Sequence, residues 1–230
     1  MTSRQPELWD AVTGERRDLP EFREEHGRAV VPLEFAPRQS LFVGFRRQRS
    51  EVRGQRSGKN FPALATLDEL TGAWTVKFDP QRGGPESVVF DTLLDWTQRP
   101  EDGIKFSSGT ATYQKRFDLP DAAPVRRLYL DLGEVKNLAR VRLNGQDLGL
   151  VWCAPWRVDI TRATKSKGND LAIEVVNTWA NRLIGDAKLP PEQRLTWTAV
   201  PTLGPNPPLL PAGLLGPVRL VGVQNVELGK

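Results

Sequence analysis

Short apolar runs with a period of two residues constrain the fold of this chain more than any other feature of its sequence. Apolar side chains alternate with polar ones at Leu128, Leu130 and Leu132, at Ala139, Val141 and Leu143, and at Leu171, Ile173 and Val175. Successive side chains of a β-strand point to opposite faces, so each run predicts a strand with one buried face. Similar runs recur along the chain, separated by Gly, Pro, Asn and Asp. The sequence therefore predicts an all-β protein.

The stretch RLNGQDL, Arg142–Leu148, gives the strongest local signal. Asn144-Gly145 lies between two alternating runs, and both residue types tolerate the positive φ that a type I′ turn requires. We therefore predict a tight hairpin here. Many short strands joined by turns are typical of a β-sandwich or jelly roll. No helical pattern competes, and LATLDEL, Leu64–Leu70, is expected to form at most a short helical turn.

The chain is predicted to have three parts. Residues 1–47 would form a short N-terminal β-strand segment, 48–60 a basic linker, and 61–230 a jelly-roll domain. About 45 residues are too few to bury a core alone, so the first part should either pack on the main body or end a preceding β-domain. The basic segment mixes Gly and Ser with Arg and has no aromatic residues to stack on bases, which favours a solvated linker over a nucleic-acid tether.

Residue counts exclude several kinds of chemistry. Cys153 and His26 are the only cysteine and histidine, which excludes a disulfide and leaves the usual zinc sites without ligands. No apolar run reaches the roughly 20 residues of a membrane span, and the N-terminus lacks a signal pattern. We therefore expect neither a membrane nor a nucleic-acid partner, and a chain that, as written, stays where it is made. Hydrolysis would have to use carboxylates, and the sequence marks no catalytic pair.

Several longer stretches resemble a known family. ELWDAVTGERRDLPEF (Glu7–Phe22) and LLDWTQRPEDGIKFSSGTATYQKRFDLP (Leu93–Pro120) resemble the C-terminal region of bacterial α-L-rhamnosidase-type glycoside hydrolases of family 106. VNTWANRLIGD (Val176–Asp186) continues the resemblance. LDLGEVKNLARVRLNGQDLGLVWCAPWRVDIT (Leu130–Thr161) is also similar to the sugar-binding jelly roll of glycoside hydrolase family 2. The resemblance implies a galactose-binding-like jelly-roll β-sandwich.

The resemblance omits the catalytic part of the family. There the catalytic carboxylates lie on a (β/α)₈ barrel that precedes this region, and the sequence contains no βαβ alternation. The resemblance therefore implies an accessory β-sandwich, whose partners would be carbohydrate and a glycoside hydrolase catalytic domain. Fold alone does not assign a sugar or a reaction.

Five residues are candidates for ligand contact: Trp156, Trp179, Asn181, Arg182 and Asp186. A flat indole matches the apolar C–H face of a sugar, while amide, guanidinium and carboxylate groups can bind its hydroxyls. The alternative for the last three is a buried polar network that pins a long loop, with Arg182 paired to Asp186 and the Asn side chains bonded to backbone. For the indoles the alternative is core packing.

Other features have structural interpretations. Trp152 is expected to fill the end of the sandwich core, and Trp74 to lie inside it. Pro201–Pro217 contains six prolines and is expected to be a surface loop rather than a central strand.

No cofactor is expected. Because jelly rolls of the resembling class often hold a structural calcium, Asp91, Asp95 and Asp159 are its possible ligands.

The leading hypothesis is a non-catalytic carbohydrate-binding or accessory module related to rhamnosidase-type glycoside hydrolases. One alternative is a small glycoside hydrolase that works through a carboxylate pair. A further alternative is a structural domain that only docks against a catalytic barrel.

Overall fold

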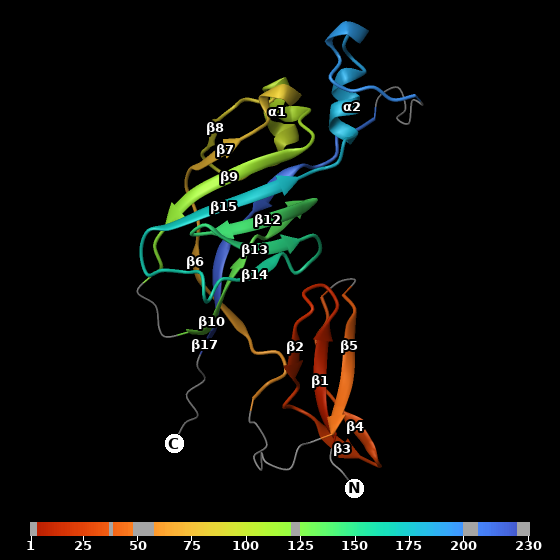
Figure 1. The fold of residues 1–230 in the computed structure, drawn as a ribbon, viewed down its shortest axis with the longest axis vertical. Helices are drawn as coiled ribbons and strands as arrows, with labels where there is room; N and C mark the ends of the chain where they lie inside the picture. Colours follow the sequence, from red (N-terminus) through yellow and green to blue (C-terminus); the bar gives the residue numbers. More distant parts are fainter. Residues whose placement is uncertain (1–3, 37–38, 48–57, 121–124, 200–206, 225–230) are drawn as a thin grey trace. The chain divides into compact units, whose positions relative to one another are not determined.

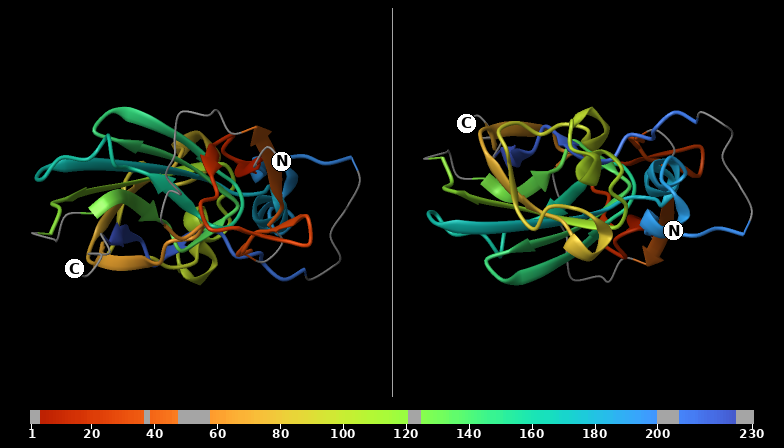
Figure 2. Two further views of the ribbon diagram at one scale, coloured as in Figure 1. Left: turned by 90° about the horizontal axis from the view of Figure 1, so that it is seen from below. Right: turned by 90° about the horizontal axis from the view of Figure 1, so that it is seen from above.

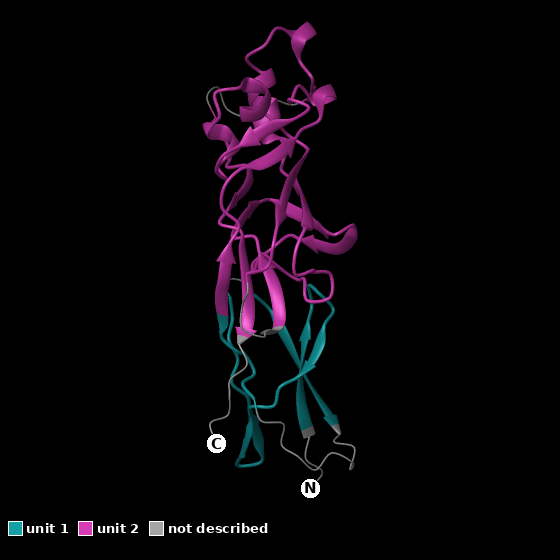
Figure 3. Ribbon diagram, turned by 90° about the vertical axis from the view of Figure 1, so that its left-hand side faces the viewer, with its two compact units in different colours: residues 1–64 teal, residues 65–230 magenta. Residues whose placement is uncertain are grey.

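The computed structural model describes residues 4–36, 39–47, 58–120, 125–199 and 207–224. The chain divides into two compact units, Met1–Leu64 and Ala65–Lys230 (Figure 3). The predicted limits of the N-terminal segment, the linker and the jelly-roll domain stay predictions, because residues 48–57 of the linker lie outside the described residues.

Unit 1 contains a three-stranded antiparallel sheet and a separate small hairpin. The sheet order is β2-β1-β5, with β1 at Arg4–Asp10, β2 at Arg16–Asp18 and β5 at Leu41–Arg47; the hairpin joins β3, Arg23–Glu25, to β4, Arg28–Val30. Leu8 and Leu19 are buried in this unit. Asn60 is fully buried and donates its amide hydrogens to the carbonyl oxygens of Glu21 (2.7 Å) and Pro32 (3.0 Å). One side chain thus joins two loops of the unit.

Unit 2 consists of two larger antiparallel sheets and a short pair of strands (Figure 1). The six-stranded sheet runs β13 (Gln146–Val151), β12 (Leu138–Leu143), β15 (Asn169–Val176), β9 (Thr110–Phe117), β7 (Trp74–Lys77) and β8 (Val88–Phe90). The four-stranded sheet runs β14 (Arg157–Asp159), β10 (Val125–Asp131), β17 (Arg219–Gln224) and β6 (Leu64–Glu69). The pair is β11 (Glu134–Lys136) with β16 (Gly213–Gly216). The prediction of an all-β sandwich is confirmed, and Figure 2 shows its layers end-on.

The predicted alternation places one face of each central strand in the core. Ala139, Val141 and Leu143 of β12 are buried, and so are the alternate residues of β15 beside them. Leu128 and Leu130 of β10 enter the same hydrophobic cluster from the other sheet. On the outer face charged side chains pair across strands, such as Arg142 of β12 with Glu174 of β15 (2.8 Å). Burial of the inner face holds the two layers together.

An aromatic group lies at the centre of this core. Trp96 and Tyr113 are fully buried, and the indole nitrogen of Trp96 donates to the Tyr113 hydroxyl oxygen at 2.6 Å. The same oxygen accepts the backbone N–H of Leu214 at 3.1 Å. Burial, as the largest cause, raises the pKa of Tyr113 to about 12. The phenol therefore stays neutral at physiological pH while it joins three segments.

The Asn-Gly hairpin forms as predicted. Asn144 has φ of 53° and Gly145 has φ of 81°, the positive values that a type I′ turn needs, and the turn connects β12 to β13.

Three local predictions are wrong. Leu64–Glu69 is strand β6, because it pairs with the distant β17. Ala180–Asp186 is helix α2 rather than loop. Gly213–Gly216, inside the predicted proline-rich loop, is strand β16 and mostly buried. Val226 and Leu228 would continue the alternating pattern as a last strand, but this prediction lies outside the described residues.

In the part of the chain that the structure describes, helices are few and short. They are η1 (Pro80–Arg82), η2 (Trp96–Gln98), α1 (Asp102–Lys105), α2 (Ala180–Asp186) and η3 (Pro191–Gln193). Among the described residues, none of the helices has the length and apolar character needed to cross a bilayer.

Candidate functional site

Helix α2 carries three of the five candidate ligand residues, and it is built around them. Asn181, Arg182 and Asp186 are all buried, together with Ile184 and Gly185. A Cβ at Gly185 would lie 2.7 Å from the Cβ of Phe106, so the helix packs closely on that ring. We call Asn181, Arg182, Asp186 and the groups bonded to them the α2 network. Its polar side chains face the protein, not the solvent.

Asn181 fastens a distant segment to the helix. Its side-chain nitrogen donates to the carbonyl oxygen of Leu210 at 2.7 Å, and its side-chain oxygen accepts the Leu210 N–H at 2.8 Å. The amide therefore makes the two bonds that a neighbouring strand would make. The segment that leads into β16 is held against α2 by this pair.

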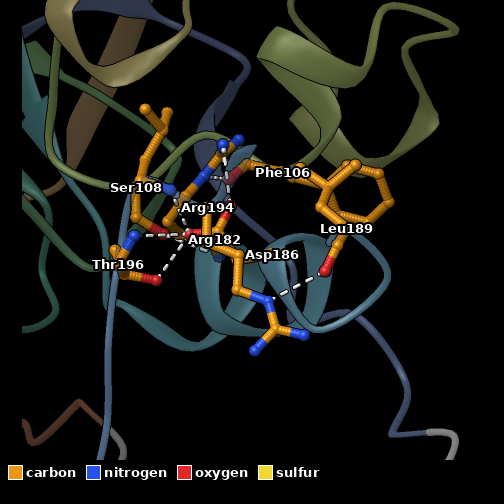
Figure 4. Close-up of polar contacts among 8 residues, drawn as sticks. Phe106, Ser108, Arg182, Asp186, Leu189, Arg194 and Thr196 are labelled. Carbon is orange, nitrogen blue, oxygen red and sulfur yellow. Dashed lines mark hydrogen bonds and ion pairs between the residues drawn. The ribbon is translucent and has the colours of Figure 1, made fainter. Parts of the chain in front are cut away.

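Arg182 and Asp186 fasten two further segments (Figure 4). The Arg182 Nε donates to the carbonyl oxygen of Phe106 at 2.9 Å, and one terminal nitrogen lies 3.4 Å from an oxygen of Asp186. The other Asp186 oxygen accepts the N–H groups of Leu195 (3.0 Å) and Thr196 (2.7 Å) and the Thr196 hydroxyl (2.6 Å). A carboxylate with three donors on one oxygen is the fixed point of the loop after α2.

The network is satisfied within the protein. In the described part of the chain, every buried side-chain nitrogen and oxygen has a hydrogen-bond partner. The Arg182–Asp186 pair and the Asn181 bonds match the loop-pinning interpretation of these residues. Direct ligand contact by Asn181, Arg182 and Asp186 stays a prediction.

Trp179 lies next to this network but faces outward. It directly precedes α2, and its side chain is 50% exposed. The guanidinium of Arg82 lies over the indole, with its carbon 4.8 Å from the ring centroid. Arg82 ends η1, about a hundred residues earlier in the chain. Sequence reasoning missed Arg82, because no local pattern links it to Trp179.

Ser108 and Asn177 anchor the start of this region. The Ser108 hydroxyl donates to the carbonyl oxygen of Thr178 (2.9 Å) and accepts the Arg182 N–H (3.2 Å). Asn177 accepts the Gly109 N–H and donates to the Ser107 carbonyl oxygen, both at 2.9 Å. The strand-to-helix turn that carries Trp179 is thus bonded on both sides to the segment before β9.

The structure separates Trp156 from the other candidates. Trp156 is partly buried, packs on the hydrophobic core and directly precedes β14, which lies in the body of the sandwich, whereas α2 lies at its upper end (Figure 1). Ligand contact by Trp156 stays a prediction, without a shared site with Trp179. Trp152 is exposed, so the expectation that it fills the core is wrong, while Trp74 is buried as expected.

Calcium binding by Asp91, Asp95 and Asp159 stays a prediction, and two of these carboxylates bond to backbone N–H groups. An Asp95 oxygen accepts the N–H groups of Thr97 (2.9 Å) and Ala212 (3.1 Å), and an Asp159 oxygen accepts that of Thr161 (2.9 Å). These carboxylates hold turns. Within the residues described, no group of three or more His, Cys, Asp or Glu side chains could hold a metal ion.

Comparisons with known proteins give matches of three kinds. Residues 96–202 match the family model described as glycosyl hydrolase 2 galactose-binding domain-like. The solved rhamnosidase from Novosphingobium sp. PP1Y is 40% identical, with a TM-score of 0.86 over 96% of this chain. A protein of Formosa agariphila named "Putative beta-glucuronidase" is 37% identical over 176 residues, covering 66% of this chain. The chain covers 21% of the rhamnosidase and 15% of the Formosa agariphila protein.

These matches confirm the resemblance to rhamnosidase-type glycoside hydrolases and to the family 2 sugar-binding jelly roll. They also confirm the galactose-binding-like type of the sandwich. The chain is a glycoside hydrolase-related protein with a galactose-binding-like domain.

Proposed function

We propose that this chain is a non-catalytic accessory module of a glycoside hydrolase and that it binds carbohydrate for a catalytic domain. The observation that carries the proposal is the match to the rhamnosidase, which extends over 96% of this chain but only 21% of that enzyme. The sugar would come from a polysaccharide that contains rhamnose or a uronic acid, in keeping with the names of the two relatives.

The described carboxylates near the strand ends support a non-catalytic role. Glu134 pairs with Lys136 (2.7 Å), Glu174 pairs with Arg142, and Asp186 accepts hydrogen bonds from the loop after α2. A retaining or inverting glycosidase needs two carboxyl groups that face a common space, one of them able to donate a proton. Carboxylates that are already committed to ion pairs and loop anchors are poor candidates for that pair.

The test combines binding and turnover on one preparation. The purified chain is titrated by calorimetry with rhamnose, galactose, glucuronic acid and plant polysaccharides, and then incubated with chromogenic α-L-rhamnosides and β-D-glucuronides. We expect saturable binding without hydrolysis. Hydrolysis above that of a mock purification would overturn the non-catalytic role, and the absence of any glycan binding would overturn the carbohydrate-binding role.

Docking is a second candidate function, favoured by one observation. Apolar side chains beside the α2 network are exposed: Trp179, Leu189, Leu195, Trp197 and Leu210. Exposed apolar groups gathered in one region are typical of a protein interface. Self-association of the isolated chain in analytical ultracentrifugation, reversed by Trp197→Ser and combined with no glycan binding, would favour this candidate over the first.

A further inference from the structure

We propose that Arg82 and Trp179 form a binding site for a uronic acid residue of an acidic carbohydrate. The inference rests on the proposed carbohydrate-binding function and assigns its site and ligand class. The Arg82 side chain is 45% exposed and the Trp179 side chain 50% exposed, so both can be reached from solvent.

Both side chains have unused donors. Arg82 makes one ion pair, from its Nε to an Asp79 oxygen at 3.3 Å. Among the described residues, neither the terminal nitrogens of Arg82 nor the indole N–H of Trp179 donates a hydrogen bond to the protein. The pair therefore offers N–H donors beside a flat apolar surface. A ligand that complements it carries an anionic acceptor next to an apolar face.

Another arginine–aromatic pair of this unit serves as a contrast. The guanidinium of Arg99 lies over the Phe90 ring at 4.8 Å, but it donates two hydrogen bonds to Glu101, at 2.6 and 3.0 Å. These bonds hold the pKa of Glu101 below its ordinary value. Arg99 thus gives both its Nε and a terminal nitrogen to Glu101, whereas Arg82 gives only its Nε to Asp79 and keeps its terminal nitrogens for a ligand.

The guanidinium of Arg82 is held in place before a ligand arrives. A Cβ at Gly109 would lie 3.3 Å from the Arg82 Cδ, so the side chain passes close to the backbone there and then stacks on the indole. Stacking fixes the plane of the guanidinium, which leaves less side-chain entropy to lose when it binds a planar carboxylate.

The α2 network positions the turn that carries Arg82. Asp186 accepts the N–H of Leu195, and the Leu195 side chain in turn packs on Gly83, the residue after Arg82. A Cβ at Gly83 would lie 3.0 Å from that side chain. Arg182 also approaches Gly83, at 3.7 Å from the same position. The buried residues predicted as ligand contacts therefore act as positioning residues that keep the loop after α2 against the turn carrying Arg82.

The donor set selects the ligand. A carboxylate can accept two parallel N–H bonds from a guanidinium, and such charge-assisted pairs are about twice as strong as neutral hydrogen bonds. A pyranose ring also presents an apolar C–H face to an indole. A uronic acid combines the two features, whereas a neutral sugar offers only hydroxyls to the guanidinium.

The experiment uses the full chain and matched sugars. Oligogalacturonate and oligoglucuronate are titrated by calorimetry in about 150 mM NaCl, which screens the general attraction of a chain with net charge +4. Their carboxyl-reduced counterparts are the control ligands. We expect at least one acidic oligosaccharide to bind about 10- to 100-fold more tightly than its reduced form, because one charge-assisted contact is lost.

Variants locate the site. Arg82→Gln and Trp179→Ala should each weaken binding of the acidic oligosaccharide about tenfold or more, and Arg82→Lys should recover only part of the loss because it lacks the planar fork. The controls are Arg219→Gln, an exposed arginine paired with Glu69, and Trp152→Ala, an exposed indole. The controls should change binding less than about twofold, and thermal unfolding should confirm that every variant is folded.

The outcomes separate this inference from the proposed function. Equal binding of the acidic and carboxyl-reduced sugars, or equal losses in Arg82→Gln and Arg219→Gln, would overturn the uronic acid site and leave carbohydrate binding intact. The absence of binding to any glycan would overturn both.

Discussion

At the residue scale, Asp186 fixes the loop after α2 by accepting three hydrogen bonds on one oxygen and pairing with Arg182 through the other. We predict that Asp186→Ala lowers the free energy of unfolding of unit 2 by about 3 kcal/mol, because it removes the charged partner of a buried guanidinium and the acceptor of two backbone donors. Urea unfolding followed by fluorescence measures the change.

The matched control for this prediction is Asp147→Ala. Asp147 pairs with Arg140 on the outer face of the sheet, where both side chains are largely exposed. Water replaces such a partner, so the change in stability should be much smaller than for Asp186→Ala. Similar losses in the two variants would mean that the α2 network is not a structural anchor.

Tyr113 gives a second prediction at this scale. Tyr113→Phe removes the oxygen that accepts the Trp96 indole N–H and the Leu214 N–H, and both donors are buried with it. Two unsatisfied donors without a large cavity should cost about 2 kcal/mol in the free energy of unfolding. A neutral or stabilising effect would mean that water reaches these groups.

The same residue predicts a pH dependence. Burial raises the pKa of Tyr113 to about 12, above the roughly 10 of an unfolded tyrosine. The unfolded state therefore loses this proton first, and stability falls as pH rises from 10 to 12, by at most about 1.4 kcal/mol per pH unit. The stability difference between the wild type and Tyr113→Phe should narrow over this range in urea unfolding. A constant difference would contradict the predicted shift.

At the element scale, α2 packs on Phe106 through Gly185. Gly185→Ala should lower the free energy of unfolding by roughly 1–2 kcal/mol, because overlap with the ring outweighs the gain of up to about 1 kcal/mol in helix propensity. Gly168→Ala is the control for backbone strain without overlap. A Cβ there meets nothing within 4 Å, and only the positive φ of this residue opposes the change. An increase in stability for Gly185→Ala would mean that the helix can shift away from Phe106.

The sequence predicts elements whose signal is local. The Asn144-Gly145 turn and the alternation along β12 need only neighbouring residues, and both appear in the structure. Strand β6 was missed because its place depends on β17, about 150 residues away. Helix α2 was missed because its buried face contains Asn181, Arg182 and Asp186, so the apolar period that reveals most helices is absent.

The candidate site could be predicted only in part for the same reason. Trp179 was identified from its residue type and its position after a strand, which are local properties. Arg82 was not, because its stacking on Trp179 exists only after η1 and the turn before α2 have been brought together by the fold. Whether Asn181, Arg182 and Asp186 pin the loop or contact a ligand depends on how deeply they are buried. The neighbouring residues in the sequence do not reveal that burial.

At the scale of the whole molecule, the two compact units have separate polar anchors. Asn60 in unit 1 and Asn169 in unit 2 are both fully buried, and each joins backbone groups of its own unit. We predict that Asn60→Ala speeds hydrogen exchange in the described residues of unit 1 and leaves those of unit 2 unchanged, because the bonds that Asn60 makes all lie within unit 1. Mass spectrometry of exchanged peptides measures this.

Asn169→Ala is the reciprocal control and should speed exchange only in unit 2. It removes the oxygen that accepts the Lys165 N–H (2.8 Å) and the Asn144 amide (2.9 Å). Faster exchange in both units for either variant would show that the chain unfolds as one cooperative body.

Two residues of α2 hold the chain that follows the helix, and the stretch between the two held positions is suited to protein engineering. Asp186 holds the chain at Thr196, and Asn181 holds it again at Leu210. A segment fixed at both ends can be exchanged or lengthened with little loss of stability, because doubling the length of a loop costs only about 0.6 kcal/mol in closure entropy. Libraries that vary the sequence between these two anchors should leave the anchors at Asp186 and Asn181 unchanged, and they would test whether that stretch affects binding.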